Sequence, residues 1–263
     1  MHFYEISING PVFRADVVTP PQARKLVESG VWIVASVTTK LSIAPNPYLT
    51  KWSRQEAARL ARQHPDLSIE EVVERVYGMR EHPETGEEIL SAKFGTLVHK
   101  ELEDALNLLK FKKQWSNKPY EKFVKPFLEW FRIHQFNVVS CESIVAGYNT
   151  AGMVDLIAED TNGRVCLFDY KTRQVAPGGD IKKKSYPSDC MQLAIEAEMV
   201  RDKMKLSYRP DVYTVIIDSN SGETYTKRWT DTAAAKAVIE AKLYISHYDD
   251  IYRLHAPDLK PLH

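Results

Sequence analysis

The sequence predicts an α/β fold with a mixed central sheet flanked by helices. Apolar residues recur at helical spacing over 91–111, and three β-rich segments follow at 136–148, 152–160 and 164–172. A second helix is predicted over 188–204 and a fourth strand over 212–218. The order helix, three strands, helix, strand implies helices packed on a sheet, and the strands joined by a hairpin must be antiparallel.

The remaining elements surround this core. Residues 1–90 are expected to form a mainly helical N-terminal region that belongs to the same domain as 91–263. A helix is predicted over 48–63, and Ser68 with Glu71 forms a capping box for a helix over 69–79. Residues 81–90 are interpreted as a polar loop. Near the C-terminus, 223–229 is a hairpin partner for the fourth strand and 232–252 a last helix.

Composition excludes several classes of protein. The 263 residues include 35 basic and 35 acidic side chains, so bulk charge gives no indication of nucleic-acid binding. No apolar run approaches the roughly 20 residues of a membrane span, so no membrane association is expected. Residues 1–13 lack a secretory signal, so we expect the protein to remain in the cytosol of the cell that makes it. Cys141, Cys166 and Cys190 are far apart, which excludes a four-cysteine iron–sulfur cluster.

The hairpin over 151–172 carries three charged residues among its apolar ones. Asp169 and Lys171 point to the same side because strand side chains alternate. A two-residue Asn162-Gly163 turn would place Asp155 opposite Tyr170. A three-residue loop over 161–163, with its glycine in the left-handed region, would instead place Asp155 opposite Asp169.

The second register would create a divalent-metal site. Directly opposed residues have Cβ atoms about 4.5–5.5 Å apart, and two carboxylates that close repel unless a cation lies between them. Oxygen ligands of this kind suit Mg²⁺ or Mn²⁺. Lys171 would lie beside the cation, where it could steady charge at a phosphate. In the alternative interpretation the aspartates only end or edge their strands and pair with Lys171.

Five short motifs resemble those of the PD-(D/E)XK nuclease superfamily. Gly152-x-x-Asp155 and Asp169-Tyr170-Lys171-Thr172 resemble its signature. Gly95-Thr96-Leu97-Val98-His99, Gln192-Leu193-Ala194-Ile195 and Ser36-Val37-Thr38-Thr39 are similar to motifs of the RecB-type exonuclease branch, which includes the Cas4 nucleases and the mitochondrial genome maintenance exonuclease. The resemblance covers most of the chain from Ser36 to about Asp218, and it implies the restriction-endonuclease-like core with a helical N-terminal extension.

The resemblance implies a role for each matching residue. Asp155, Asp169, His99 and the backbone carbonyl of Tyr170 would bind the catalytic metal, Mg²⁺ or Mn²⁺. Lys171 would be the catalytic lysine, and Gln192 would support the site or touch the nucleic acid. Glu142 resembles a recurrent acidic position of the branch. Two departures matter: Glu196 stands where the branch has a tyrosine, and the cysteines that hold an iron–sulfur cluster in many relatives are missing, so no cluster is expected.

Contacts to DNA are expected from polar, basic and aromatic groups. The set is Ser36, Thr38, Lys51, Trp52, Thr172, Lys182, Lys183 and Lys184. Single-strand binders combine cationic and aromatic groups in this way. Equally, Ser36 could cap a helix, Trp52 could lie in the core, and the lysine run could be a solvated face.

These expectations lead to a metal-dependent DNA exonuclease. We expect phosphodiester hydrolysis with a preference for single strands, in DNA replication, recombination or repair, for example of a phage. An endonuclease of the same superfamily and a non-catalytic nucleic-acid-binding module are the alternatives. The polarity of digestion, the number of metals and the oligomeric state are left open by the sequence.

Overall fold

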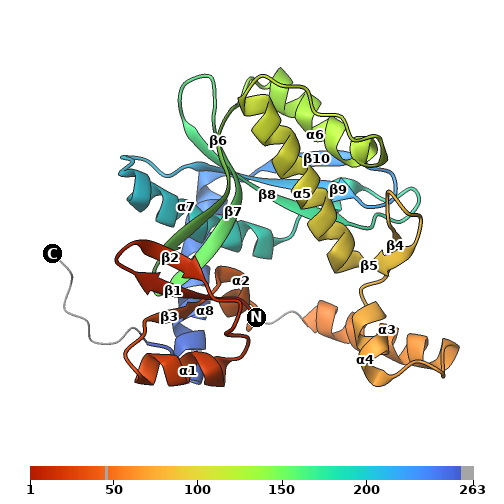
Figure 1. Ribbon diagram of the computed structural model, residues 1–263, viewed down its shortest axis with the longest axis horizontal. Helices are drawn as coiled ribbons and strands as arrows, with labels where there is room; N and C mark the ends of the chain where they lie inside the picture. Colours follow the sequence, from red (N-terminus) through yellow and green to blue (C-terminus); the bar gives the residue numbers. More distant parts are fainter. Residues whose placement is uncertain (45–46, 256–263) are drawn as a thin grey trace.

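A mixed five-stranded sheet is the centre of the molecule (Figure 1). The computed structural model describes residues 1–44 and 47–255. The strand order is β10-β9-β8-β7-β6, and only β8 and β9 of this sheet are parallel neighbours. The strands are β6 (Asn137–Gly147), β7 (Thr150–Glu159), β8 (Val165–Arg173), β9 (Asp211–Asp218) and β10 (Thr224–Arg228). This confirms the predicted α/β fold with a mixed sheet.

Helices cover both faces of this sheet. One face packs against α5 (Ser91–Lys110) and α6 (Glu121–Ile133), and the other against α2 (Val37–Leu41), α7 (Pro187–Met204) and α8 (Asp231–Tyr252). Alternation along β8 explains the two cores, because Phe168 and Tyr170 join the first while Val165 and Leu167 join the second. The 3₁₀ turns η1 (Lys118–Tyr120) and η2 (Ile181–Lys184) precede α6 and α7. The sequence analysis did not predict α6.

A second, three-stranded sheet lies in the N-terminal region, where mainly helix was expected. Its order is β2-β1-β3, and both pairings are antiparallel. The elements are β1 (Phe3–Ser7), β2 (Gly10–Phe13), α1 (Pro20–Glu28) and β3 (Ile33–Ala35). An isolated parallel bridge between Ser36 and Ala151 connects the end of β3 to β7. The N-terminal residues therefore pack directly against the strand that carries Asp155.

The next segment has two helices that lie away from the sheet and a short hairpin that contacts α5 (Figure 1). It comprises α3 (Pro47–Gln63), α4 (Ile69–Arg75), β4 (Met79–Glu81) and β5 (Glu88–Leu90). The predicted helix over 48–63 and the capping box between Ser68 and Glu71 are confirmed. The helix predicted over 69–79 begins as expected but ends at Arg75, because Gly78 has a positive φ of 87° and Met79 begins a strand. The predicted polar loop over 81–90 was wrong at its ends, because Met79 pairs with Leu90 and Glu81 with Glu88 in a short hairpin.

A buried polar cluster joins distant parts of the chain. The Lys40 ammonium is fully buried and contacts the Asp249 carboxylate and the backbone carbonyl of Asn149. The Asn149 side-chain amide donates to Asp249 at 2.9 Å and to the Leu254 carbonyl at 2.8 Å. Because a buried charge is costly without a partner, these contacts hold α2, the β6–β7 turn and α8 together. Within the described ranges, no helix combines the length and apolar character needed to cross a bilayer.

Candidate active site

The β7–β8 hairpin adopts the three-residue loop. The Asp160 amide donates to the Arg164 carbonyl at 3.0 Å, and Gly163, with φ +71°, donates to the Asp160 carbonyl. The ladder runs from the Glu159–Val165 pair to the Leu156–Phe168 pair. Continuing this register by one step places Asp155 opposite Asp169. The structure therefore confirms the register of the three-residue loop.

The two strands diverge immediately beyond the Leu156–Phe168 pair. The Tyr170 amide does not continue the ladder and instead donates to Asp155 Oδ2 at 2.7 Å. Asp155 and Asp169 consequently lie at a fork in the sheet. Side chains from α5 on one face and from α7 on the other can reach this fork.

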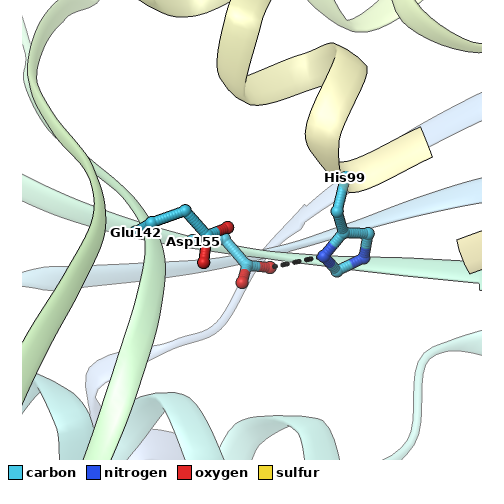
Figure 2. A group of neighbouring side chains, drawn as sticks. All are labelled: His99, Glu142 and Asp155. Carbon is cyan, nitrogen blue, oxygen red and sulfur yellow. Dashed lines mark ion pairs between the residues drawn. The ribbon is translucent and has the colours of Figure 1, made fainter. Parts of the chain in front are cut away.

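Three potential metal ligands converge on the α5 side of the fork. His99 from α5, Glu142 from β6 and Asp155 from β7 have ligand atoms within 4.8 Å of one another (Figure 2). His99 Nδ1 lies 3.6 Å from Asp155 Oδ2, and the His99 ring packs edge-on against the Tyr170 ring with their centroids 5.5 Å apart. An imidazole and two carboxylates form a donor set that suits several divalent first-row cations, Mn²⁺ among them.

Glu142 reaches this cluster through two irregularities in β6. A bulge between Val138 and Ser140 shifts the register by one, so that Glu142 lies across from Asp155 rather than from Val154. Glu142 itself has a positive φ of 49°, which is uncommon for a residue other than glycine. Strained backbone of this kind clusters at functional sites. The sequence analysis noted Glu142 only as a recurrent acidic position and did not predict it as a metal ligand. Neither the bulge nor the positive φ could be predicted from the sequence.

A hydrogen-bonded network occupies the α7 side of the fork. Asp169 Oδ1 accepts from Lys171 Nζ at 2.8 Å and from Gln192 Nε2 at 3.1 Å. Gln192 Oε1 accepts from Lys171 at 3.1 Å, and its Nε2 also donates to Glu196 at 3.3 Å. The ammonium can only donate and the carboxylates can accept, so these three partners fix the orientation of the Gln192 amide.

Asp169 retains one atom that the described protein leaves unsatisfied. Its Oδ2 is buried and has no hydrogen-bond partner within residues 1–44 and 47–255. An unpaired buried carboxylate oxygen costs free energy, and such an atom requires an explanation, for example an ion. Asp169 is not one of the three residues whose ligand atoms lie within 4.8 Å of one another, so a cation that also satisfies this oxygen would have to lie between that cluster and Asp169.

The pKa values of the acidic side chains at the site are raised, which shows that these groups are crowded together. Burial and the nearby Asp155 raise the pKa of Glu142 to about 7. Burial, reinforced by the aspartates, also raises the pKa of Glu196 well above its usual value. Burial raises the pKa of Asp169 as well, although Lys171 opposes this shift. Repulsion among acidic groups is what a bound cation relieves, so the residues fit a divalent metal.

His99 and Lys171, the two basic groups of the site, have the protonation states that a metal-binding site requires. Burial lowers the pKa of His99, and Asp155 only partly offsets this effect, so the imidazole is neutral and able to bind a metal. Burial also acts to lower the pKa of Lys171, but Asp169 and Asp155 outweigh it and the pKa is raised. Lys171 is therefore a fixed cation next to the carboxylates.

Glu196 is a site residue to which the sequence analysis assigned no role. Its side chain is 2 % exposed and lies against Gly152, where a Cβ atom would come within 2.8 Å of Glu196 Oε1. Gly152 thus makes room for a carboxyl group in the position of the branch's tyrosine. The available signal was the glycine of the Gly152-x-x-Asp155 motif together with an acidic residue inside an otherwise apolar helix.

The residues expected to contact DNA fall into different environments. Ser36 is buried and caps α2 by accepting from the Thr39 amide at 3.1 Å, which is the alternative role given for it, so we leave it out of the proposed interface. Thr38 and Lys51 are exposed, while the side chain of Trp52 lies outside the described residues.

The other expected DNA contacts lie close to β8. Thr172 packs against Gly95, where a Cβ atom would come within 2.9 Å of its hydroxyl. On η2, Lys182 and Lys183 are exposed and Lys184 is half-buried. The backbone carbonyl of Lys184 accepts from Arg173, which fixes η2 at the end of β8.

Comparison with known proteins gives only distant similarity. The sequence matches no known family and no curated protein. The solved structure of a candidate exonuclease from Eubacterium rectale has 14% sequence identity and a TM-score of 0.41, over 66% of this chain and 71% of that chain. The structure of SSO0001 has 14% identity and a TM-score of 0.32, over 79% and 81% of the two chains. Because similarity at this level assigns no family, function has to be argued from the site.

Proposed function

We propose that this protein is a metal-dependent nuclease with a PD-(D/E)XK core. The observation that carries the proposal is the fork between β7 and β8, where Asp155 groups with His99 and Glu142 and the neighbouring strand holds Asp169 against Lys171. The unsatisfied Asp169 oxygen adds to it. An ordinary pair of strand-end aspartates would not need a half-buried lysine, a neutral histidine and a third carboxyl group around it.

His99, Glu142, Asp155 and Asp169, with the backbone carbonyl of Tyr170, would hold a divalent cation, Mg²⁺ or Mn²⁺. When bound, such a cation supplies positive charge at a phosphate and lowers the pKa of a water molecule. The ammonium of Lys171 adds a second positive charge on the same face and can stabilise negative charge that develops on the phosphate.

Gln192 has a positioning role in this scheme. Its amide accepts from Lys171 and donates to Asp169, so it fixes the position of Lys171 relative to Asp169. Catalytic groups held in one orientation avoid the cost of reorganising during the reaction. Gln192 therefore does not need to touch the substrate to be required for the rate.

The substrate we propose is DNA, with single strands preferred and cleavage from an end, in replication, recombination or repair within the cytosol of a bacterial or phage-infected cell. Thr38, Lys51, Thr172 and the lysines of η2 are the proposed phosphate contacts. In this proposal the two parts belong to one domain. Residues 1–90 bind the DNA strand, and residues 91–263 form the nuclease core.

The deciding experiment is a gel assay with end-labelled single-stranded, double-stranded and circular DNA in Mg²⁺, Mn²⁺ or EDTA. Metal-dependent loss of linear single strands, with circles spared, is the expected result. Cut circles would establish an endonuclease instead. Binding without cleavage in either metal would favour a non-catalytic nucleic-acid-binding module.

The matched control is Asp169→Asn, which removes the charge while keeping the size of the side chain. It should abolish cleavage and leave folding and DNA binding largely intact. Cleavage by this variant at the wild-type rate would refute the metal assignment.

A further inference from the structure

Large apolar side chains lie on the outer face of α8. Ile239 is 64 % exposed, Leu243 is 66 % exposed and Ile251 is 51 % exposed. At about 100° per residue, the three lie within about 120° of arc, opposite the residues that α8 buries against α2 and α7. By contrast α5, which is 20 residues long, exposes no large apolar side chain. A helix with apolar residues on both faces is normally buried on both, so we expect another surface to cover this one.

Two opposite charges lie symmetrically on the same face of α8. Lys236 comes seven residues before Leu243, and Asp250 comes seven residues after it. Seven residues are nearly two helical turns, so all three side chains point to the same side of the helix. Lys236 is exposed and has no ion-pair partner within the described part of the chain. The side chain of Asp250 remains 64 % exposed, although His255 lies 3.4 Å away.

We propose that this face is the interface of a homodimer in which the α8 helices of two copies pack antiparallel, with Leu243 of each copy at the two-fold axis. Residues at equal distances before and after Leu243 then meet, so Lys236 faces the partner's Asp250. The two-fold axis creates this ion pair twice. A parallel arrangement would instead place Lys236 against the partner's Lys236. The inference concerns assembly and does not rest on the proposed nuclease function.

The pattern on α8 favours a second copy over a different protein. A different protein would not require two opposite charges placed at equal distances from an apolar centre, whereas a two-fold interface must be complementary to itself. The same symmetry brings Ile239 to the level of the partner's His247 and Ile251 to the level of the partner's Ala235. No exposed apolar side chain of α8 therefore faces an acidic residue, a lysine or an arginine.

The length of the contact sets the expected strength of the dimer. The segment from 235 to 251 is about 24 Å long at about 1.5 Å per residue. A helix pair of this length lies at the small end of specific interfaces, which bury about 1,200–2,000 Å² in total. We therefore expect a dimer that dissociates at roughly micromolar concentrations.

The test measures the oligomeric state of the full chain by analytical ultracentrifugation over roughly 1 to 100 μM. The wild type should convert from monomer to dimer within this range. Lys236→Glu and Asp250→Lys each place two like-charge pairs in the interface, so each should weaken dimerisation roughly tenfold or more. An equimolar mixture of the two variants should dimerise about as well as the wild type, because every facing pair in the heterodimer again has opposite charges.

Two controls separate this interface from a general effect of charge or folding. Lys93→Glu makes the same charge reversal at an exposed position of α5 and should dimerise like the wild type. Circular dichroism of Lys236→Glu and Asp250→Lys should show a folded chain. A wild type that is monomeric throughout the range, a dimer that neither variant weakens, or a mixture of the variants that stays monomeric would overturn the proposal.

Discussion

Replacing Glu142 by glutamine should stabilise the metal-free protein at alkaline pH. Glutamine keeps nearly the same size but cannot ionise. In the wild-type protein the Glu142 carboxyl is half-buried next to Asp155, where ionisation is unfavourable unless a cation is present. A candidate metal ligand is thus expected to destabilise the fold when its metal is removed.

The magnitude follows from the pKa of Glu142, which burial and Asp155 raise from 4.5 to about 7. The folded chain therefore holds this proton more tightly than the unfolded chain. The stability that results is fully present below pH 4.5 and is lost as pH rises through about 7. A difference of about 2.5, at about 1.36 kcal/mol per pKa unit, gives at most about 3 kcal/mol for the partly exposed carboxyl.

The assay is thermal unfolding in EDTA at pH 5 and pH 8, repeated at pH 8 with Mg²⁺. Glu142→Gln should melt close to the wild type at pH 5 and up to roughly 6–12 °C higher at pH 8 in EDTA. Mg²⁺ should raise the wild-type melting temperature more than that of the variant. Glu129→Gln, the same change on the exposed side of α6, should track the wild type throughout. A Glu142→Gln advantage that is absent at pH 8, or equal at both pH values, would refute the reasoning.

His99→Ala should lower the cleavage rate or weaken its dependence on Mg²⁺, and wild-type kinetics across a Mg²⁺ titration would reduce His99 to a packing residue. Glu196→Met should raise the melting temperature in EDTA at pH 8, because it removes a buried carboxyl group, and should slow cleavage by up to roughly tenfold because Gln192 loses an acceptor. Unchanged cleavage would remove Glu196 from the network. Lys40→Met should cost about 3–5 kcal/mol in urea unfolding because it leaves the Asp249 charge buried without a cation, and Lys40→Met/Asp249→Leu should recover most of the loss. A loss below about 1 kcal/mol for the single variant would contradict the role of the pair.

The parts of the fold that the sequence predicted are those with strong local signals. The helix around His99 has an apolar stripe at helical spacing, and the hairpin has apolar strands on either side of Asn162-Gly163. The choice between its two registers depended on a single residue in the loop. The opposed carboxylates supplied the chemical reason to consider the register that the structure has.

The parts that were missed have weak local signals or depend on distant contacts. The N-terminal strands are three to five residues long, so they show too little alternation to predict. Burial of Glu196 depends on the space left by Gly152, which lies on another element. The position of Glu142 depends on a bulge and a left-handed residue that the backbone adopts only in the assembled sheet.

The loop at 161–163 makes the active site sensitive to a choice of turn far from it. This turn lies about 17 Å along the strand from Asp155, yet the number of residues that it uses decides which residue the aspartate faces. With the three-residue loop, Asp160 pairs with Arg164 and the register leads to Asp155 opposite Asp169. If the same residues formed the two-residue Asn162-Gly163 turn, Thr161 would join the ladder and Asp155 would lie opposite Tyr170, which separates the carboxylates without altering any of them. Related chains that kept this chemistry would therefore need turn residues that favour the three-residue loop, with glycine at the position that has φ +71°.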